Sequence, residues 1–600
     1  MNLTISSLLA GYRENQFSPE QVVDFVLQRS TQFIDKNIWI SLLSREQIQP
    51  YIENLKTAPK DLPLYGIPFA IKDNIDLAGV CTTAACSDFE YLPSQSAFVV
   101  AKLIEAGAIP IGKTNMDQFA TGLVGTRSPE PWGICQNAFD SSYIAGGSSS
   151  GSAVAVSLGL VSFSLGTDTA GSGRVPAALN NLIGLKPSKG LLSMQGVVPA
   201  CRSLDCVSIF ALNTDDANSV FNVAAVYDDK DDYARKNTFE NNHRFYREIK
   251  HNFSFLVPKT AQLDFFGDKN TAELFDASVD QLINLGGKKV EVDFSPFLSA
   301  AKLLYEGPWV AERYVAIEET ITKKTGALLP VIKQIIGGAV KHRATDVFKS
   351  QYQLQHLKKI TDAILNQADF LLTPTVGTTY TIDEVERNPI ELNTRLGYYT
   401  NYMNLLDYAC IAVPGGFLDK GLPWGVSLVA PAFSDRRLLS YARLLQSHLQ
   451  LPLGAGSDSF IPEPLGYPIQ QGSVSIVVCG AHLSNLPLNW QLTERHATLL
   501  EKTTTSDSYR MYALAGGPPY RPGLIRDECE GVSIEIEVWS LPSAEFGSFV
   551  ANIPAPLGIG KVEIQDGRWL PGFICEPYGI TDAEEITHLG SWRSYMEHLS

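Results

Sequence analysis

The chain has 600 residues, which is too many for one hydrophobic core, so two or more domains are expected. Its 45% hydrophobic and 19% charged residues are ordinary for a globular protein, and no window holds the roughly 18 uninterrupted apolar residues of a membrane-spanning helix. The 64 acidic and 48 basic residues give a net charge of −16, which argues against a nucleic-acid partner and requires a local cation for any anionic substrate.

The first part of the chain predicts an α/β fold. Ser18, Pro19 and Gln21 supply an N-cap, a proline at the first helical position and the third residue of a capping box, so a helix is expected there. Further helical stretches are expected at 97–106 and 435–448. Buried strands are predicted at 65–71, 161–166, 369–373, 410–413 and 425–430. This alternation predicts a mixed central β-sheet flanked by helices over residues 1–450.

A change of composition follows at 451–470, where prolines and glycines cluster and predict a linker between domains. Beyond it, short strands bounded by turn residues are expected at 474–479, 509–514, 533–539 and 561–564. The sequence therefore predicts a large domain at 1–450, a linker at 451–470 and a small β-rich domain at 471–600.

The termini and the cysteines indicate the compartment. No basic region followed by an apolar stretch opens the chain, because the first basic residue is Arg13, so a cytoplasmic location is expected. The nine cysteines show no spacing typical of a metal site, and no metal is predicted. Cys201 and Cys206 are close enough in sequence to form a bridge, but reduced, buried thiols are expected in a cytosolic protein.

Two clusters of glycine and serine are the most unusual local sequences, GGSSSGSA at 146–153 and GTDTAGSGR at 166–174. A flexible loop is the alternative for either alone, but the first leads into an apolar helix and the second follows a buried strand. Both are therefore predicted to be fixed turns. Glycine beside serine lets successive backbone N–H groups converge on an oxyanion. The predicted donors are Thr169, Ala170, Gly171 and Ser172, with the Ser172 hydroxyl as the attacking group.

A serine nucleophile requires a base, and the first 242 residues contain no histidine. A desolvated lysine can serve, because burial disfavours its charged form and lowers its pKa. Lys72 in GIPFAIKDNID ends an apolar strand, where Asp73 and Asn74 are placed to restrain it. Alone, Lys72 would more often be a surface lysine, but beside the serine clusters it is predicted to be the base. A phosphate loop is the rival use of the glycines, and GxxxxGK[ST] is absent.

Three segments, GIPFAIKDNID, GGSSSGSA and GTDTAGSGRVPAA, resemble the motifs of the amidase signature family, as do KTNMDQFATG at 113–122 and LIGLKPSKG at 182–190. The resemblance spans residues 1–450 and implies an amidase-signature fold and amide hydrolysis. It implies that Ser172 is the acylated nucleophile, Ser148 a bridging serine on a cis peptide, and Lys72 the ultimate base. Ser150 and Ala170 stand where the family usually has glycine, which indicates a subfamily without removing a catalytic group.

Within that family the chain resembles the allophanate hydrolases, through PACRSLDCVSIF at 199–210, YEGPWVAERY at 305–314, VCGAHLSNLPLN at 478–489 and YALAGGPPYRPGL at 512–524. The implied substrate is allophanate, the anion of N-carboxyurea, and the implied products are two ammonia and two carbon dioxide. The resemblance implies no cofactor and a homodimer. Whether a urea carboxylase associates with the chain is left open.

Residues around Gly307-Pro308 predict how the substrate anion is held. Proline starts a helix on which Trp309, Arg313 and Ile317 share a face, and Arg313 can clamp a carboxylate in a bidentate manner. Tyr305 can donate its hydroxyl to the same anion. Spacing alone favours an alternative in which Arg313 pairs with Glu306 or a distant carboxylate, and the resemblance favours the substrate role.

Arg174 and Asp168 flank the nucleophile and are predicted to brace its loop rather than to react. In the C-terminal domain, the resemblance implies a small α+β barrel like that of γ-glutamyl cyclotransferase, linked to decarboxylation of the first product or to assembly. His482 is the candidate catalytic group there, although a lone histidine is more often structural.

Two rival functions remain. The chain is either another amidase-signature enzyme that acts on a small carboxylate-bearing or aliphatic amide, or a non-catalytic subunit that uses the fold as a scaffold. The presence of Lys72, Ser148 and Ser172 together weighs against the scaffold, which has no need of all three.

Overall fold

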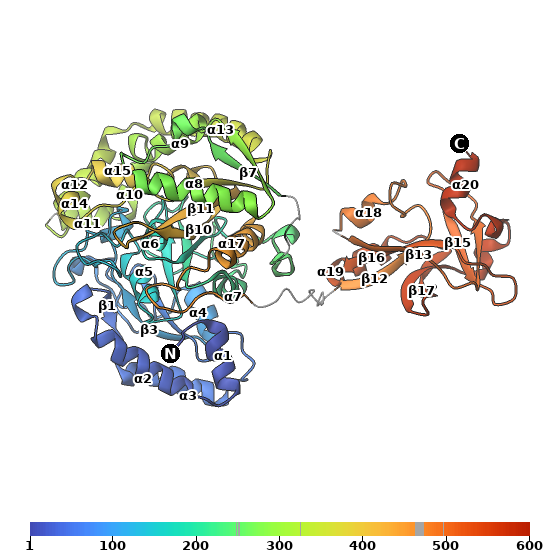
Figure 1. Cartoon of the computed structure of the whole chain (residues 1–600), viewed down its shortest axis with the longest axis horizontal. Helices are drawn as coiled ribbons and strands as arrows, with labels where there is room; N and C mark the ends of the chain where they lie inside the picture. Colours follow the sequence, from blue (N-terminus) through green and yellow to red (C-terminus); the bar gives the residue numbers. More distant parts are fainter. Residues whose placement is uncertain (248, 250–252, 325, 463–472, 496, 600) are drawn as a thin grey trace. The chain divides into compact units, whose positions relative to one another are not determined.

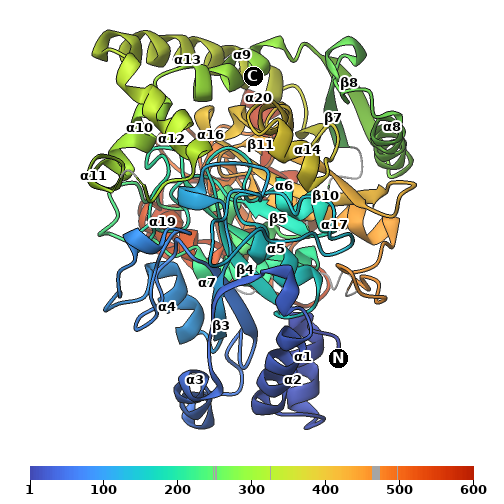
Figure 2. The ribbon, with the colours of Figure 1, turned by 90° about the vertical axis from the view of Figure 1, so that its left-hand side faces the viewer.

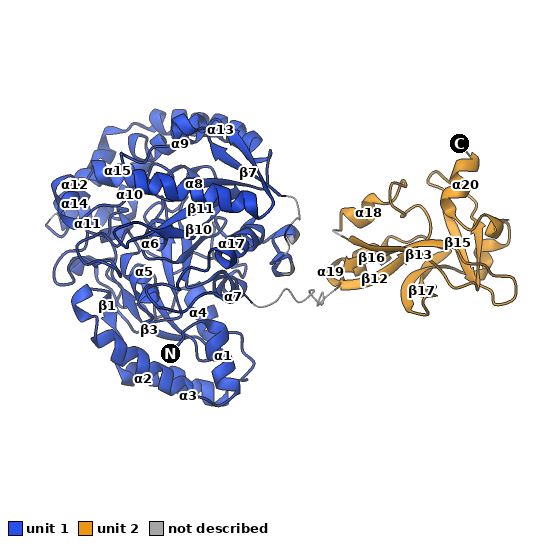
Figure 3. Ribbon diagram, in the orientation of Figure 1, with its two compact units in different colours: residues 1–464 blue, residues 465–600 orange. Residues whose placement is uncertain are grey.

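The computed structural model describes residues 1–599 except 248, 250–252, 325, 463–472 and 496. The chain divides into two compact units, Met1–Pro464 and Leu465–Ser600 (Figures 1 and 3). Among the described residues, no helix combines the length and the apolar character that crossing a membrane requires.

The first unit is built on a mixed sheet of 11 strands among the described residues. In spatial order these are β1 (Trp39–Leu42), β3 (Ile109–Thr114), β2 (Pro68–Lys72), β4 (Phe163–Asp168), β6 (Cys206–Ala211), β5 (Ile183–Lys186), β10 (Tyr408–Phe417), β11 (Pro423–Pro431), β9 (Phe370–Pro374), β7 (Phe253–Pro258) and β8 (Gly287–Val292). Strands β3, β2 and β4 are parallel to one another, and so are β9, β7 and β8. The pairs between them, from β4 through β6, β5, β10 and β11 to β9, are antiparallel. The predicted mixed central sheet flanked by helices is confirmed.

Helices cover this sheet, and Figure 2 shows the N-terminal pair α1 and α2 together and α9 beside α13. The helices are α1 (Ile5–Arg13), α2 (Pro19–Thr31), α3 (Arg45–Thr57), α4 (Phe98–Glu105), α5 (Ser150–Ser157), α6 (Val175–Leu179), α7 (Thr214–Ala224), α8 (Lys269–Asn284), α9 (Ser295–Glu306), α10 (Trp309–Ala316), α11 (Glu318–Lys323), α12 (Pro330–Gly337), α13 (Ala344–Leu365), α14 (Ile382–Arg387), α15 (Glu391–Leu396), α16 (Tyr402–Leu405) and α17 (Asp435–Leu449). The capping box predicted at Ser18 and Gln21 is present at the start of α2.

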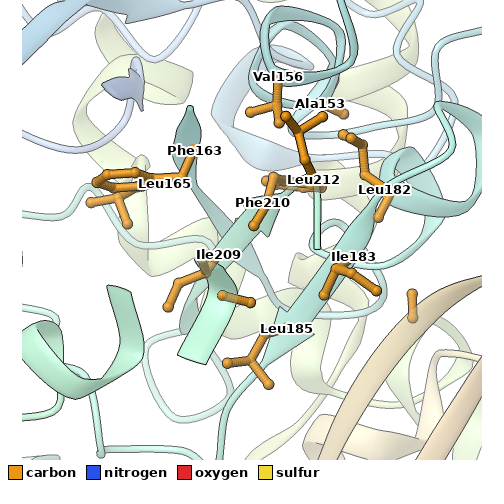
Figure 4. Close-up of a cluster of buried hydrophobic side chains, with 14 of the residues drawn as sticks. Ala153, Val156, Phe163, Leu165, Leu182, Ile183, Leu185, Ile209, Phe210 and Leu212 are labelled. Carbon is orange, nitrogen blue, oxygen red and sulfur yellow. The ribbon is translucent and has the colours of Figure 1, made fainter. Parts of the chain in front are cut away.

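Helix α5 explains why the first glycine and serine cluster is not a flexible loop. All eight of its residues are buried. Ala153 and Val156 lie in the same apolar cluster as Phe163 of β4 and Phe210 of β6 (Figure 4). Small side chains let this helix lie close to the sheet: a Cβ on Gly151 would lie 2.3 Å from the carbonyl oxygen of Ile38.

The second unit is an α+β domain, as predicted. Its described strands form a sheet in the order β13 (Thr498–Thr504), β16 (Glu535–Pro542), β12 (Ser473–Val478), β18 (Trp569–Cys575) and β17 (Leu557–Glu563), and a second sheet of β15 (Pro522–Arg526), β14 (Tyr509–Ala513) and β19 (Glu584–Glu585). The helices are α18 (Trp490–Thr493), α19 (Ser543–Ala551) and α20 (Trp592–Leu599). The barrel implied by the resemblance stays a prediction.

The predicted linker at 451–470 falls partly on residues 463–470, which lie outside the described residues. Its first part packs on the first unit, because the Asn181 side-chain amide donates to the carbonyl oxygens of Pro452 at 2.7 Å and Gly454 at 2.9 Å. All nine cysteines are free thiols, and Cys201 and Cys206 are buried, as expected.

Candidate active site

Lys72 is the last residue of β2 and is fully buried. Its ammonium nitrogen donates to the Ser148 hydroxyl at 2.7 Å and to the Thr167 hydroxyl at 2.8 Å. No carboxylate among the described residues lies within ion-pair distance of it. Burial lowers the pKa of Lys72 to about 7, although the more distant Asp117 opposes the shift. A lysine with this pKa is half neutral at physiological pH and can accept a proton.

The residues expected to restrain Lys72 act differently. Asp73 does not face it, because the Asp73 carboxylate lies 3.3 Å from the ammonium of Lys113 and accepts a hydrogen bond from Thr83. Asn74 donates to the same Thr167 hydroxyl at 3.4 Å. Thr167 is therefore the residue that, together with Ser148, fixes the position of the lysine.

Ser148 follows a cis peptide bond with Gly147 and lies two residues before the start of helix α5. Its carbonyl oxygen accepts the backbone N–H of Asp117 at 3.0 Å, and the N–H of Gly147 donates to Leu123 at 2.8 Å. A Cβ on Gly147 would lie 2.1 Å from the Asp117 carboxylate. Only glycine fits at position 147, so the segment around Asp117 holds the serine in place.

Ser172 lies in the turn that follows β4 and is 3% exposed. Its hydroxyl makes a long hydrogen bond of 3.5 Å to the carbonyl oxygen of Gly122. Among the described residues, no hydrogen bond joins the hydroxyls of Ser172 and Ser148. The structure thus joins Lys72 to Ser148 directly and leaves the Ser172 hydroxyl with a single long hydrogen bond among the described residues.

The backbone around Ser172 offers unused donors. In the described part of the chain, no acceptor takes a hydrogen bond from the N–H groups of the predicted oxyanion turn, Thr169 to Ser172. Gly171 has a φ of +155°, and a Cβ there would lie 2.6 Å from the Thr400 hydroxyl, so this position requires glycine. These buried N–H groups are available to a substrate oxyanion.

Asp168 and Arg174 bracket this turn and form a buried ion pair of 2.8 Å. The Asp168 carboxylate also accepts the backbone N–H of Gly173 at 2.9 Å, and the Asn404 side-chain amide donates to the Asp168 carbonyl oxygen at 2.9 Å. Burial raises the pKa of the Asp168 carboxyl, but Arg174 overrides this effect and holds the pKa below its usual value. Neither side chain is free to react, and the pair has the geometry of a brace.

Arg313 is buried on α10, and its guanidinium donates to the Thr121 hydroxyl at 3.2 Å and the Ala120 carbonyl oxygen at 3.4 Å. These residues directly precede Gly122, which contacts Ser172. The guanidinium carbon lies 5.7 Å from the centre of the Tyr305 ring. No carboxylate of a described residue, Glu306 included, forms an ion pair with Arg313, so the structural pairing that spacing alone favoured is not present.

A cavity of about 260 Å³ lies beside Tyr305 and is bounded on the α10 side by Val310. Tyr305, Arg127, His342 and Asn393 are among its lining residues. The Asn393 side chain accepts the backbone N–H of Leu123 at 2.8 Å, and Arg127 donates to the Thr121 carbonyl oxygen at 2.9 Å. The cavity therefore adjoins the segment that carries Gly122.

Sequence reasoning missed several residues of this site: Thr167, Asp117, Gly122, Arg127 and Asp205. Three of them stand within segments already recognised as family-like, Asp117 and Gly122 in KTNMDQFATG and Asp205 in PACRSLDCVSIF. Thr167 lies in the second glycine and serine cluster. These residues could have been recognised from the sequence as polar residues that lie inside the family-like motifs but had been given no role.

His482 lies in the second unit and lines a cavity of about 70 Å³ together with Gln491, Arg521 and Asn552. Its ring stacks on Phe573 with centroids 5.0 Å apart, and its Nε2 lies 2.9 Å from the Gln491 side-chain oxygen. Burial lowers the pKa of His482 below its usual value. The histidine is thus neutral near pH 7 and lines a cavity of mostly apolar residues, with Gln491, Arg521 and Asn552 as polar lining residues.

Each of the two units matches a known protein family. A family model described as Amidase matches residues 22–439, and one described as Allophanate hydrolase C-terminal domain matches residues 474–597. The urea amidolyase of Saccharomyces cerevisiae is 45% identical over 582 residues, covering 94% of this chain. The match covers 31% of that relative, so the chain spans about a third of its length.

Two solved structures resemble the whole chain. The allophanate hydrolase of Kluyveromyces lactis matches with a TM-score of 0.78 and 41% identity, covering 100% of this chain and 99% of that one. The urea amidolyase of the same organism matches with a TM-score of 0.78 and 40% identity, covering 100% of this chain and 37% of that one.

Proposed function

The chain belongs to the amidase family, and from this membership we propose that it hydrolyses allophanate with Ser172, Ser148 and Lys72 as its catalytic residues. The C-terminal domain match and the resemblance to the Kluyveromyces lactis enzyme over the full chain support the choice of substrate. The observation that carries the chemistry is the buried Lys72, which has no ion-pair partner among the described residues and donates to the Ser148 hydroxyl at 2.7 Å.

In the proposed reaction, neutral Lys72 takes the Ser148 proton while Ser148 takes the proton of Ser172. The Ser172 oxygen attacks the terminal carboxamide carbon of allophanate. The N–H groups from Thr169 to Ser172 receive the resulting oxyanion, a contribution of about 3–4 kcal/mol per donor in related sites. The proton returns to the departing nitrogen and ammonia leaves. Water then cleaves the acyl-enzyme by the reverse proton route and releases N-carboxycarbamate, which decarboxylates.

We assign the substrate carboxylate to Arg313 and Tyr305. Arg313 is buried without a carboxylate partner among the described residues, and an unpaired buried guanidinium is costly unless a ligand neutralises it. The chain carries a net charge of −16, so this local cation supplies the attraction that the general field of the protein does not. The carboxylate then anchors the substrate with its amide near Ser172.

Replacing Arg313 by alanine should raise KM for allophanate by about 100-fold, because a bidentate charge-assisted contact contributes about 3 kcal/mol. Steady-state ammonia release measures the change, with Arg387→Ala, an exposed arginine on α14, as the control variant. An unchanged KM would remove Arg313 from the carboxylate site.

The main rival is an amidase for neutral aliphatic amides. Comparing ammonia release from allophanate, malonamate and acetamide separates the two functions. We expect kcat/KM to be highest for allophanate and lowest for acetamide, because acetamide leaves Arg313 unpaired in its pocket. If acetamide is the best substrate, the assignment to allophanate is wrong.

For the second unit we propose that His482 assists decarboxylation of N-carboxycarbamate. Its support is the placement of a neutral histidine beside Arg521 in one cavity, where a cation can hold the anionic intermediate. The alternative is that the domain serves assembly alone.

The His482→Ala variant should release the first ammonia at the unaltered rate and delay carbon dioxide and the second ammonia. Early ammonia would then approach one equivalent per allophanate consumed rather than two. His588, an exposed histidine in the same unit, gives the matched control His588→Ala. Two equivalents at the unaltered rate would leave His482 with a structural role.

We further propose a cytoplasmic homodimer that receives allophanate from a urea carboxylase. The support is chemical and comparative, because allophanate is carboxylated urea and the full-length relatives are named urea amidolyases. Sedimentation of the purified chain, alone and mixed with such a carboxylase, tests both associations.

A further inference from the structure

The loop Pro199–Asp205 contacts the oxyanion turn through its last residue. The Thr169 hydroxyl donates to the Asp205 carboxylate, which also accepts the backbone N–H groups of Ala200 at 2.8 Å and Cys201 at 3.1 Å. Asp205 is 5% exposed. Three donors from two segments therefore converge on one buried carboxylate, which ties the loop to the first residue of the oxyanion turn.

The same loop is attached to α10 by its middle residues. The Glu312 carboxylate accepts both the backbone N–H and the hydroxyl of Ser203, each at 2.7 Å. The Cys201 thiol donates to the Trp309 carbonyl oxygen at 3.6 Å. Glu312 directly precedes Arg313, so the loop is fixed to the helix one residue from the guanidinium that we assign to the substrate carboxylate.

The loop between these two attachments is compact. The backbone N–H groups of Leu204 and Asp205 both donate to the Cys201 carbonyl oxygen, at 2.8 and 2.9 Å. Ala170, Cys201 and Leu204 belong to one buried apolar cluster, on which Trp309 packs. A shift of α10 is therefore transmitted to the oxyanion turn rather than absorbed within a loose connection.

We propose that the loop Pro199–Asp205 couples the anion site at Arg313 to the oxyanion turn at Thr169, with Glu312 and Asp205 as positioning residues. This inference rests on the proposed function. Binding of the substrate carboxylate fixes α10, the loop transmits that position, and the N–H groups of the turn are held where the oxyanion forms. Binding energy from a non-reacting group is thereby used to raise kcat rather than only to lower KM.

The charge on Asp205 agrees with this role. Burial raises the pKa of Asp205 to about 6, while the Thr169 hydroxyl and the backbone donors oppose the rise. The carboxyl is thus ionised at neutral pH, and each of its donors keeps an acceptor. The Glu312 carboxylate binds Ser203 of the loop rather than Arg313, so it does not occupy the guanidinium that we assign to the substrate.

The test compares malonamate, which carries a carboxylate, with malonamide, its neutral counterpart of the same size. The unaltered chain should show a higher kcat for malonamate. In Glu312→Ala that preference in kcat should fall by about tenfold, since a bond to a charged acceptor is lost. The preference in KM should remain, because Arg313 is still present. Glu312→Gln can keep a bond to Ser203 and should restore most of the kcat preference.

Glu306→Ala removes an exposed carboxylate at the end of α9 and serves as the matched control. Thermal unfolding of each variant checks that it folds, and Ser203→Ala, which removes one of the two bonds to Glu312, is the milder variant should Glu312→Ala unfold. An equal fall in kcat for both substrates, in whichever of these variants folds, would overturn the coupling. Failure of the unaltered chain to hydrolyse malonamate and allophanate would instead refute the proposed function.

Discussion

Replacing Ser172 by alanine is expected to lower ammonia release from allophanate by at least about 10⁴-fold, the scale seen when serine hydrolases lose their nucleophile. The variant keeps the N–H group of residue 172 and the turn that carries it, so substrate still binds. What is lost is the only group proposed to form the acyl-enzyme. Single-turnover ammonia release measures the change, and mass spectrometry of a quenched reaction should detect no acylated protein.

Ser150→Ala is the matched control. Ser150 is a buried serine at the start of α5 whose hydroxyl makes a long bond of 3.5 Å to the Asn115 carbonyl oxygen and also interacts with the Cys135 thiol. It stands close to Ser148 in sequence without contacting Lys72 among the described hydrogen bonds. Its loss should change kcat by less than about threefold, the effect of one weak hydrogen bond. Unaltered ammonia release by Ser172→Ala would show that another group is the nucleophile.

Lys72→Met is expected to reduce kcat/KM by about 10³-fold, within the range that general base catalysis contributes. Methionine keeps the length and apolar contacts of the side chain but accepts no proton. The substitution also removes the hydrogen bonds that Lys72 donates to the hydroxyls of Ser148 and Thr167. Thermal unfolding of the variant separates loss of the base from loss of the fold, and Lys102→Met is the control, at a half-buried lysine of α4 that pairs with Glu105.

The pH dependence of the unaltered chain tests the same residue. The folded pKa of Lys72 is about 7 and its usual value is 10.5, so the neutral form predominates in the folded protein above pH 7. The rate should be level above that value and fall by about tenfold per pH unit below it, because the base becomes protonated. A rate that stays level down to pH 5 would exclude Lys72 as the base.

The contact between Lys72 and Ser148 could be anticipated from the sequence, because each of the residues proposed to be catalytic lies in a short motif at the end of a buried element. Lys72 ends an apolar strand, and Ser148 and Ser172 lie in turns whose glycines admit no side chain. Strands with a continuous apolar run were likewise predictable. Strand β8 was not, because its sequence GKKVEV is an exposed edge with lysines that break the apolar pattern.

The residues that were missed act across long separations. Thr167 is recognisable only once β2 and β4 are adjacent, which brings its hydroxyl to Lys72. Asp205 matters because its carboxylate accepts a hydrogen bond from Thr169, and Glu312 matters because its carboxylate accepts hydrogen bonds from Ser203. No local pattern encodes such pairings, since each partner alone is an ordinary polar residue. Asp73 shows that neighbours in sequence need not interact. It directly follows Lys72, but its carboxylate pairs with Lys113.

The strand order also has a consequence for synthesis on the ribosome. Strand β5, which begins at Ile183, pairs with β10, which begins at Tyr408, so the middle of the sheet joins segments made far apart in time. The brace of the nucleophile turn includes Asn404, which lies just before β10. Closing so long a loop is slow and loses conformational entropy, and only the contacts of the completed sheet offset that loss. A nascent chain that already contains Ser172 therefore stays inactive until the last strands of the sheet emerge, and in that interval it depends on protection from aggregation.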